Sequence, residues 1–525
     1  MVRIGNEIDI GYALRYNEPN AMTVEMGRYV IMKRWFPLVL ILVLLLAFTV
    51  PAQASSTAGL VRGKVTDDNS SMLIAAIIVE DEAGATYRAM TNALGGYSLA
   101  LEPGTYTLTF TKGNEFSTVT RTVEVESLKT YYLQDARLTA LYDSYAKGWV
   151  AGDCHQHTYY SDGVDSVLDS MVGNASAGVY FGFLTDHNTS RGVPEWNNAT
   201  QVNVRTVNGE NRYFKGFDGV EVTTEFGHYN SLGSGCTLET YDVKLTEFER
   251  ASKEKLSYAR EKIMYIADCI TRIGGLAQMN HPYSSTTMGV MNWIEKGDWE
   301  VFDLYDTIEI WNGYFVPCDG IYDTLNAMNQ NYSSKLLWYE LLGGMKEGHP
   351  FHAATGGTDN HDISAPVSAK SRESYASALP TTLEEYYNYW VSTAKYNGMP
   401  TTYIHLGDKE LTLENVQDCV KSGKSFITSG PVVLCDIGGM SYGETVAAQA
   451  GDTLTVNADI WNRDGISEIA VVVNGETVKT IALNGETSFT DTIELTADWE
   501  AFDWILFEVK GPIGQYAITN PILIG

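Results

Sequence analysis

The chain has 525 residues, too many for a single hydrophobic core, and this length predicts roughly three domains. Hydrophobic residues make up 44% of the chain and aromatic residues 11%, which excludes a wholly disordered protein. The formal net charge is −29, which excludes nucleic-acid duplexes and anionic membranes as broad surface partners, because both need basic patches. A small anionic substrate held by metal ions is compatible with this charge.

Residues 1–54 have the pattern of a secretory signal. Lys33-Arg34 precede an apolar run at 38–50, and a small-x-small cleavage pattern follows at 52–54. The run is shorter than the roughly 20 residues that a membrane-crossing helix needs. We therefore expect a secreted or extracytoplasmic protein with no stable membrane span after cleavage. An uncleaved segment, which would hold the protein at the cell surface, is the alternative, and Met32 is an alternative start to Met1.

The cysteines are spaced too widely for a Cys-x-x-Cys metal site and form no dense disulfide framework. We expect most of them to be small buried hydrophobic residues. They are Cys154, Cys236, Cys269, Cys318, Cys419 and Cys435.

Residues 55–144 have an all-β pattern. Gly59–Val65 alternates in polarity, and turn residues occur at Gly95-Gly96 and Pro103-Gly104. The two turns lie in the sequences G-G-Y-S-L and P-G-T-Y-T-L, which resemble the carboxypeptidase-regulatory-like β-sandwich. The resemblance implies a structural or binding role for this segment.

Residues 145–430 alternate strand-like and helix-like segments, which is typical of a (βα) barrel. Residues suited to metal binding recur where the predicted strands end, the position at which barrel enzymes place their active sites. Five motifs follow this rule: Asp153-Cys154-His155-Gln156-His157 with Ser161-Asp162-Gly163, Thr185-Asp186-His187-Asn188, Gly219–Thr224 with Gly227-His228, Asn280-His281-Pro282, and Thr358-Asp359-Asn360-His361.

The first motif places two imidazoles on one face of a strand. Alternate side chains of a strand share a face, so His155 and His157 would project together while Cys154 points the other way. Taken alone, His281 would more often be a turn or core residue, and Glu221 a salt-bridge partner. Occurring together, these residues favour a metal centre.

The five motifs, in this order, resemble the polymerase-and-histidinol-phosphatase (PHP) superfamily of metallohydrolases. Ser425–Pro431, with the sequence S-F-I-T-S-G-P, resembles the carbaryl-hydrolase-like (CehA/McbA) branch of that superfamily. The resemblance implies a multi-domain α/β protein in which a distorted (βα) TIM-like barrel is flanked by two β-sandwiches. It also implies a site for two or three divalent metal ions.

The resemblance assigns the ligands to three groups, with Glu221 bridging the first two. The groups are His155, His157, Glu221 and Asp359; Glu221, His228 and His281; and Asp162, His187 and His361. Mixed imidazole and carboxylate ligands suit Zn, Mn or Fe better than Ca or Mg. Glu221, Asp359 and His281 are the residues expected to be catalytic.

Paired ions of this kind hold a hydroxide at neutral pH, which predicts hydrolysis by a metal-bridging hydroxide. The predicted bond is a phosphoester in a small substrate, because three cations can neutralise the charge of a phosphoryl group. One alternative is carboxylester, carbamate or amide hydrolysis of the carbaryl-hydrolase type. Another is a non-catalytic extracellular binding protein with structural metals. The second and third groups have only three protein ligands each, and such open positions favour catalysis.

Five further residues, outside the three ligand groups, have expected roles. Asp153 and Asp186 are expected to orient ligand imidazoles, as carboxylates near metals usually do. Arg191 and Arg372 are candidate contacts for the anion of a substrate, although solvated surface arginines are the alternative. His405 is expected to be structural.

Residues 431–525 return to a period of two, which predicts a second β-sandwich. Asn474-Gly475 lies between Val471–Val473 and Glu476–Val478, and this pattern predicts a β-hairpin with a type I′ turn. The predicted division is a signal segment at 1–54, a carboxypeptidase-regulatory-like β-sandwich at 55–144, a PHP barrel at 145–430 and a C-terminal β-sandwich at 431–525. The two β-sandwiches are candidates for contact with the cell envelope or carbohydrate.

Overall fold

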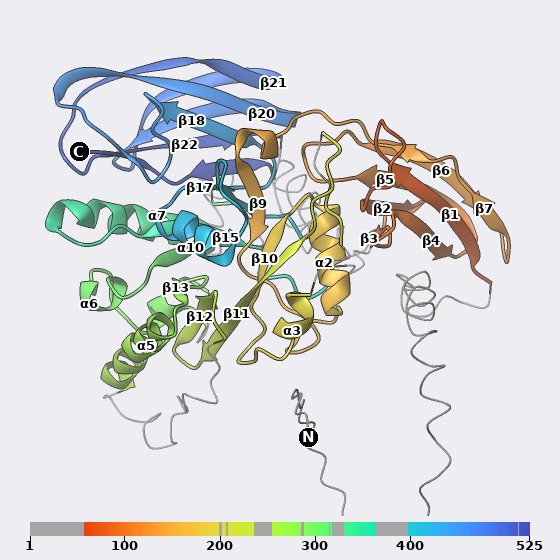
Figure 1. Cartoon of the computed structure of the whole chain (residues 1–525), viewed down its shortest axis with the longest axis horizontal. Coiled ribbons are helices and arrows are strands. Elements are labelled where there is room, and N and C mark those ends of the chain that lie inside the picture. Colours follow the sequence, from red (N-terminus) through yellow and green to blue (C-terminus); the bar gives the residue numbers. More distant parts are fainter. Residues whose placement is uncertain are drawn as a thin grey trace, which may run out of the picture. The chain divides into compact units, whose positions relative to one another are not determined.

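The computed structural model describes residues 57–198, 202–205, 208–235, 255–284, 288–313, 316–317, 330–363, 397–512 and 514–525 (Figure 1). The predicted signal segment, Arg372, Cys236 and Cys318 lie outside these residues. Within the described ranges, no helix is long and apolar enough to cross a membrane. Cys154, Cys269, Cys419 and Cys435 are free and buried, as expected.

The N-terminal part consists of two four-stranded sheets that share one buried core. Alternate apolar residues such as Val61, Ile77 and Phe110 fill this core. One sheet has the order β4-β1-β7 with β8 on β1, and the other has the order β3-β2-β5-β6. The strands are β1 (Gly59–Thr66), β2 (Ala76–Asp81), β3 (Thr86–Met90), β4 (Gly96–Leu101), β5 (Gly104–Thr111), β6 (Val119–Val125), β7 (Thr130–Tyr132) and β8 (Ala136–Arg137).

The central part is a mixed α/β arrangement around a curled sheet. Its strands are β9 (Trp149–Asp153), β10 (Phe181–Leu184), β11 (Lys215–Thr224), β12 (Gly227–Leu232), β13 (Leu276–Met279), β14 (Thr307–Asn312), β15 (Ala353–Gly357), β16 (Thr401–His405) and β17 (Ser425–Thr428). Its helices are η1 (Tyr145–Lys147), α2 (Val167–Ser176), α3 (Val193–Trp196), α5 (Lys255–Arg272), η3 (Val290–Asn292), α6 (Trp299–Phe302), α7 (Gln330–Gly343), η4 (Gly344–Glu347) and α10 (Leu413–Lys421).

The central sheet departs from the parallel strand order of a (βα) barrel at two places, β12 and β16. Strand β16 is antiparallel to both of its neighbours, β9 and β17. β9, β10 and β11 are parallel, and so are β13, β14 and β15. β12 is antiparallel to both of its neighbours, β11 and β13. Only Glu225 and Phe226 separate β11 from β12, which is too short a connection for a crossover helix. The sheet is therefore a curled half-barrel with a hairpin inserted in it.

The chain segments that follow β9 and β15 lie side by side. The backbone N–H of Asp359 donates to the carbonyl of His155 at 2.8 Å, and the N–H of His157 donates to the carbonyl of Asn360 at 2.9 Å. Two segments separated by about two hundred residues in sequence thus form one edge. Both segments carry predicted metal ligands.

Strands β18 (Val432–Ile437), β19 (Thr445–Val446), β20 (Ala450–Val473), β21 (Glu476–Asp498), β22 (Trp504–Lys510), β23 (Tyr516–Thr519) and β24 (Ile522–Ile524) complete the chain. Antiparallel pairing of β17 with β23 joins them to the central sheet. Asn474 and Gly475 have φ values of 50° and 87° between β20 and β21, which confirms the predicted hairpin turn.

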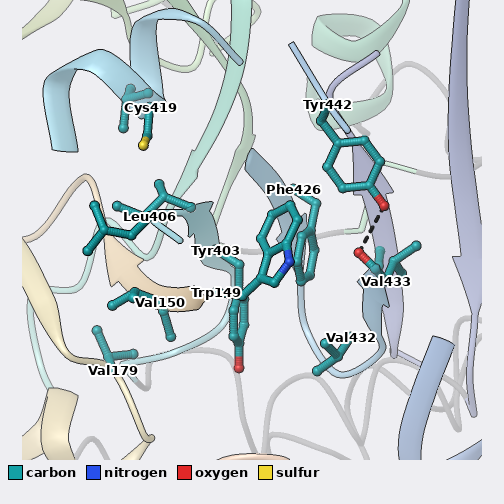
Figure 2. Close-up of a cluster of buried hydrophobic side chains, with 14 of the residues drawn as sticks. Trp149, Val150, Val179, Tyr403, Leu406, Cys419, Phe426, Val432, Val433 and Tyr442 are labelled. Atoms are coloured by element: carbon teal, nitrogen blue, oxygen red, sulfur yellow. Dashed lines mark hydrogen bonds between the residues drawn. The ribbon is translucent and has the colours of Figure 1, made fainter. Parts of the chain in front are cut away.

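An aromatic cluster anchors the beginning of β9 (Figure 2). The Trp149 ring stacks on His405 at a centroid distance of 4.7 Å and packs against Phe426 at 5.3 Å. Tyr442 lies 5.5 Å from the same ring and donates its hydroxyl proton to the carbonyl of Val433 at 2.9 Å. His405 therefore has the structural contact expected of it, and β9 begins inside a packed aromatic cluster.

Candidate metal centre

The nine predicted ligands lie together at one edge of the curled sheet. They come from its two parallel groups, β9–β11 and β13–β15, and from β12 between them. Each ligand lies in a strand or in the loop that directly follows one, so the hydrogen-bonded pairing of the strands positions the ligands. His155, His157 and Asp162 follow β9, His187 follows β10, Glu221 lies in β11, His228 in β12, His281 follows β13, and Asp359 and His361 follow β15.

Glu221 lies at the middle of this set and is fully buried. Its two carboxylate oxygens face five imidazoles. The distances from Oε1 are 3.1 Å to His228 Nδ1 and 3.3 Å to both His155 Nε2 and His281 Nε2, and those from Oε2 are 2.7 Å to His187 Nδ1 and 3.5 Å to His157 Nε2. The Asn280 amide also donates to Oε1 at 2.9 Å.

Asp359 is the second carboxylate of the inner part, and its side chain is 21% exposed. Its Oδ1 lies 2.9 Å from His157 Nε2 and 3.3 Å from His155 Nε2, so these two imidazoles lie between two carboxylates. Asp359 and His281 have positive φ angles of 47° and 27°, which residues other than glycine rarely adopt. Such strain persists only where surrounding contacts maintain it, and it concentrates at functional sites.

Asp162, His187 and His361 form a more open group. Asp162 Oδ1 lies 3.1 Å from His361 Nε2, and its Oδ2 lies 3.4 Å from His187 Nε2. The Asp162 side chain is 57% exposed and that of His361 36%, whereas that of Glu221 is 1% exposed. The site therefore has a buried inner part and an outer part that faces solvent.

The residues fit divalent cations. Their ligand atoms form four overlapping groups in which the atoms lie within 4.8 Å of one another, and all nine predicted ligands belong to these groups. Among the described residues, His155 Nε2, both ring nitrogens of His157, Glu221 Oε2 and His281 Nδ1 are buried without a hydrogen-bond partner. Each such atom costs about 1–3 kcal/mol, and a bound cation would satisfy several at once. Ion binding itself stays a prediction.

His187 differs from its predicted place. It was expected to belong only to the outer group with Asp162 and His361. In the structure it also joins Glu221 and His228, because its two ring nitrogens face different carboxylates. His187 thus connects the inner and outer parts.

Glu221, Asp359 and His157 are held in the protonation states that bind metals, whereas nearby carboxylates outweigh burial and raise the pKa of His155, His187 and His281. Burial alone would raise the pKa of the Glu221 carboxyl, but the imidazoles of His155 and His228 outweigh burial and hold its pKa well below the usual range. The imidazoles of His155 and His157 likewise hold the Asp359 pKa well below its usual range despite burial. Burial lowers the pKa of His157 to about 4. Ionised carboxylates and a neutral imidazole are the forms that bind metals.

Asp153 and Asp186 do not have the expected role. Asp153 accepts hydrogen bonds from the backbone N–H of His155 and from the N–H and hydroxyl of Thr358. Asp186 accepts from the N–H and hydroxyl of Thr158, each at 2.7 Å. The prediction that they orient imidazoles was wrong. Instead, the two carboxylates accept hydrogen bonds from the loops that contain the ligands. These contacts depend on how the loops fold, which the sequence motifs do not specify.

The carboxylate that contacts a ligand imidazole is Glu309 in β14, which lies outside the five sequence motifs. It is fully buried, and its Oε1 lies 2.9 Å from His155 Nδ1. A single acidic residue in the apolar run Thr307–Trp311 was the available signal, because an ionisable side chain in a buried strand needs a partner.

Arg191 lies beside the site's loop residues. Its guanidinium carbon is 5.9 Å from the centroid of the Tyr160 ring, and Tyr160 stacks on Tyr159 at 4.5 Å. Contact between Arg191 and a substrate anion stays a prediction.

Comparison with known proteins identifies one segment. Residues 60–139 match the carboxypeptidase regulatory-like domain. This match confirms the predicted resemblance of the N-terminal part, and such domains are typical of extracellular or surface proteins. No curated protein matches the chain.

Three solved structures resemble the chain at low identity. A two-domain protein of Bacteroides vulgatus containing a predicted PHP-like metal-dependent phosphoesterase is 12% identical, with a TM-score of 0.34 over 71% of this chain and 95% of that chain. An amidohydrolase of Chromobacterium violaceum is 16% identical, with a TM-score of 0.26 over 40% of this chain and 87% of its own. A protein of Bifidobacterium adolescentis, described by inference as a metal-dependent phosphoesterase, is 13% identical, with a TM-score of 0.24 over the same shares.

Proposed function

We propose that this protein is an exported, metal-dependent hydrolase that cleaves phosphoester bonds of a small anionic substrate. Its residues 145–430 would form a TIM-like PHP barrel of the carbaryl-hydrolase-like branch, between two β-sandwiches. The observation that carries the proposal is a fully buried carboxylate, Glu221, faced by five imidazoles and accompanied by Asp359.

The site would hold two or three ions of Zn, Mn or Fe in the predicted ligand groups. When bound, such ions supply Lewis acidity and a hydroxide at neutral pH. Glu221 presents both of its oxygens to ligand imidazoles, so it can serve two neighbouring positions. Burial of His155, His157 and Glu221 excludes bulk water from the inner part, which strengthens electrostatic interactions there.

The outer group supports a phosphoester as substrate. The Asp162 side chain is exposed and that of His361 is partly exposed, so an incoming molecule would meet the outer part first and the buried Glu221 behind it. Three cation positions can neutralise a phosphoryl group, whose charge spreads over several oxygens. The predicted catalytic residues Glu221, Asp359 and His281 all lie on the inner side of this path.

The proposed location and partners follow from other parts of the chain. The signal pattern at 33–54 and the regulatory-like domain at 60–139 support export. The net charge of −29 disfavours nucleic-acid duplexes as partners. Contact of the β-sandwiches with the cell envelope or carbohydrate belongs to the same proposal.

A parallel assay of nitrophenyl phosphate, bis-nitrophenyl phosphate and nitrophenyl acetate tests the proposal on purified protein supplied with Zn²⁺, Mn²⁺ or Fe²⁺. We expect turnover of a phosphate ester and none with the Glu221→Ala variant. Turnover of the acetate alone would favour the carboxylester, carbamate or amide hydrolase. Tight metal binding without turnover in a wide substrate panel would favour the binding protein.

A further inference from the structure

The Glu309 side chain makes hydrogen bonds to two different predicted ligands. Its Oε1 lies 2.9 Å from Nδ1 of His155, and its Oε2 accepts from the backbone N–H of His281 at 3.0 Å. Oε2 also accepts from the side-chain amide of Asn312 at 3.0 Å. One buried carboxylate in β14 thus joins a residue that follows β9 to one that follows β13.

We infer that Glu309 is the positioning residue of the metal centre, selecting the ring tautomer of His155 and the backbone conformation of His281. The inference rests on the proposed function, because it assigns a role toward the ions that function requires. Glu309 would not touch a substrate and acts through the two ligands.

The contact with His155 determines which ring nitrogen is free to bind a cation. A carboxylate accepts hydrogen bonds and cannot donate them, so Nδ1 of His155 must carry the proton that it shares with Glu309. In the neutral ring, Nε2 then keeps its lone pair. His155 Nε2 is the atom that lies 3.3 Å from both Glu221 and Asp359, and it is buried without a hydrogen-bond partner.

The contact with His281 holds a strained backbone. His281 has a φ of 27°, and its N–H points at Glu309 Oε2. Its Nε2 lies 3.3 Å from Glu221 Oε1, so this conformation brings the imidazole to the shared carboxylate. Without the acceptor, the N–H would be buried and unpaired, and the strained conformation would lose a contact that maintains it.

Replacing Glu309 by glutamine removes the negative charge of the side chain and keeps its shape. The substitution therefore tests the contacts with His155 and His281. An amide has one oxygen, so it can accept from His155 or from the His281 and Asn312 donors, but not from both sides. If the amide nitrogen faces His155, Nδ1 becomes an acceptor and the ring proton moves to Nε2, which blocks the ligand atom. Either orientation impairs one ligand.

Competition with a chelating dye measures the affinity of the wild-type and variant proteins for Zn²⁺ and Mn²⁺. We expect Glu309→Gln to lower the affinity by about 10–100-fold, as loss of an outer partner of a ligand histidine does. Glu115→Gln is the matched control, since Glu115 is also a buried carboxylate and its oxygen accepts from the Ser144 N–H. That control should keep wild-type affinity. Wild-type affinity in Glu309→Gln would overturn the inference.

The tautomer of His155 can be read without a variant. Long-range ¹H–¹⁵N correlation spectra of histidine-labelled wild-type protein, assigned by comparison with His155→Gln, should show a proton on Nδ1 and none on Nε2 in the metal-loaded state. A proton on Nε2 would overturn the inference even if Glu309→Gln fails to fold. If wild-type protein binds neither ion, the proposed function fails, and the presence or absence of a proton on Nδ1 of His155 in the metal-free protein still decides the role of Glu309.

Discussion

Glu221 shows how single residues define the inner site. A buried carboxylate is stable only when paired, and the groups that face Glu221 are imidazoles that can also bind cations. Its two oxygens face ligands in β12 and in the segments that follow β9, β10 and β13. Loss of this one side chain therefore affects every ligand group except the outermost.

We expect Glu221→Ala, and likewise His155→Ala or Asp359→Ala, to abolish hydrolysis and weaken metal binding by more than the roughly 100-fold that loss of an outer partner costs. The N-terminal β segment should stay folded, because its core is a separate cluster. Metal analysis, turnover and circular dichroism of each variant check this. Wild-type turnover of Glu221→Ala with metal present would disprove the bridging role.

Glu115 provides a pH-dependent prediction away from the metal centre. Burial raises its pKa from 4.5 to about 7. A carboxyl with a raised folded-state pKa contributes stability that is full below the unfolded pKa of 4.5 and is lost as pH rises through about 7. The wild-type protein must ionise this buried group above that pH, whereas a glutamine variant does not.

We therefore expect Glu115→Gln to gain unfolding free energy relative to the wild type as pH rises from about 4.5 to about 7, by roughly 3 kcal/mol in total. Denaturant unfolding at several pH values measures the difference. Lys112 also makes stability depend on pH, with the opposite sign, because burial lowers the pKa of its amine to about 7. This contribution is the same in both proteins, so it cancels in the difference between their unfolding free energies. A difference that does not vary with pH would contradict the prediction.

At the scale of elements, a glycine in a turn and a glycine at a helix end differ in backbone φ angle. Gly475 closes the β20–β21 hairpin with a φ of 87°, and a Cβ there would meet Tyr339 and Trp504 only at 3.7 and 3.9 Å. Space is therefore adequate, and the cost of a side chain is conformational. Gly343, the last residue of α7, has a φ of −59°, and a Cβ there would meet nothing within 4 Å.

The same substitution should have opposite effects at these two positions. We expect Gly475→Ala to lower the unfolding free energy by about 1–2 kcal/mol, because an alanine in the left-handed region is strained. Gly343→Ala should raise it by about 0.5–1 kcal/mol, because alanine restricts the unfolded chain and favours the helix. Thermal unfolding of both variants checks the pair. Destabilisation by Gly343→Ala as well would contradict the prediction that the φ angle of each glycine determines the sign of the effect.

On the scale of the whole molecule, a buried ion pair links α7 to the C-terminal strands. Lys335 Nζ lies 2.9 Å from Glu508 Oε1 in β22, and the hydroxyl of Tyr339 donates to the same oxygen at 2.5 Å. Both charged side chains are at most 10% exposed. Removing one partner would leave the other charge buried.

We expect Lys335→Met to destabilise the protein by about 3–5 kcal/mol, and the double variant Lys335→Met/Glu508→Gln to recover part of this loss. Denaturant unfolding of the two single variants and the double variant forms a double-mutant cycle. Additive losses would show that the two side chains act independently.

Residue types and periodicity in the sequence determined the positions of many strands, of one hairpin turn and of the ligand residues. Alternating polarity predicted the N-terminal strands, Asn474-Gly475 predicted a turn that requires positive φ angles, and the ligand types at strand ends predicted residues that the fold gathers at one edge. These features depend on neighbours a few residues apart, or on where a strand ends, so a linear pattern contains them.

Only the tertiary structure decided the contacts between distant segments. The partner of the His155 imidazole is Glu309, 154 residues away, and not the neighbouring Asp153. His187 lies between two carboxylates because β10 lies between β9, which Asp162 follows, and β11, which contains Glu221. Hydrogen bonds act over about 3 Å, so strand order and sheet curvature decide which carboxylate reaches which imidazole. Residue type and spacing in the sequence do not specify that order or curvature.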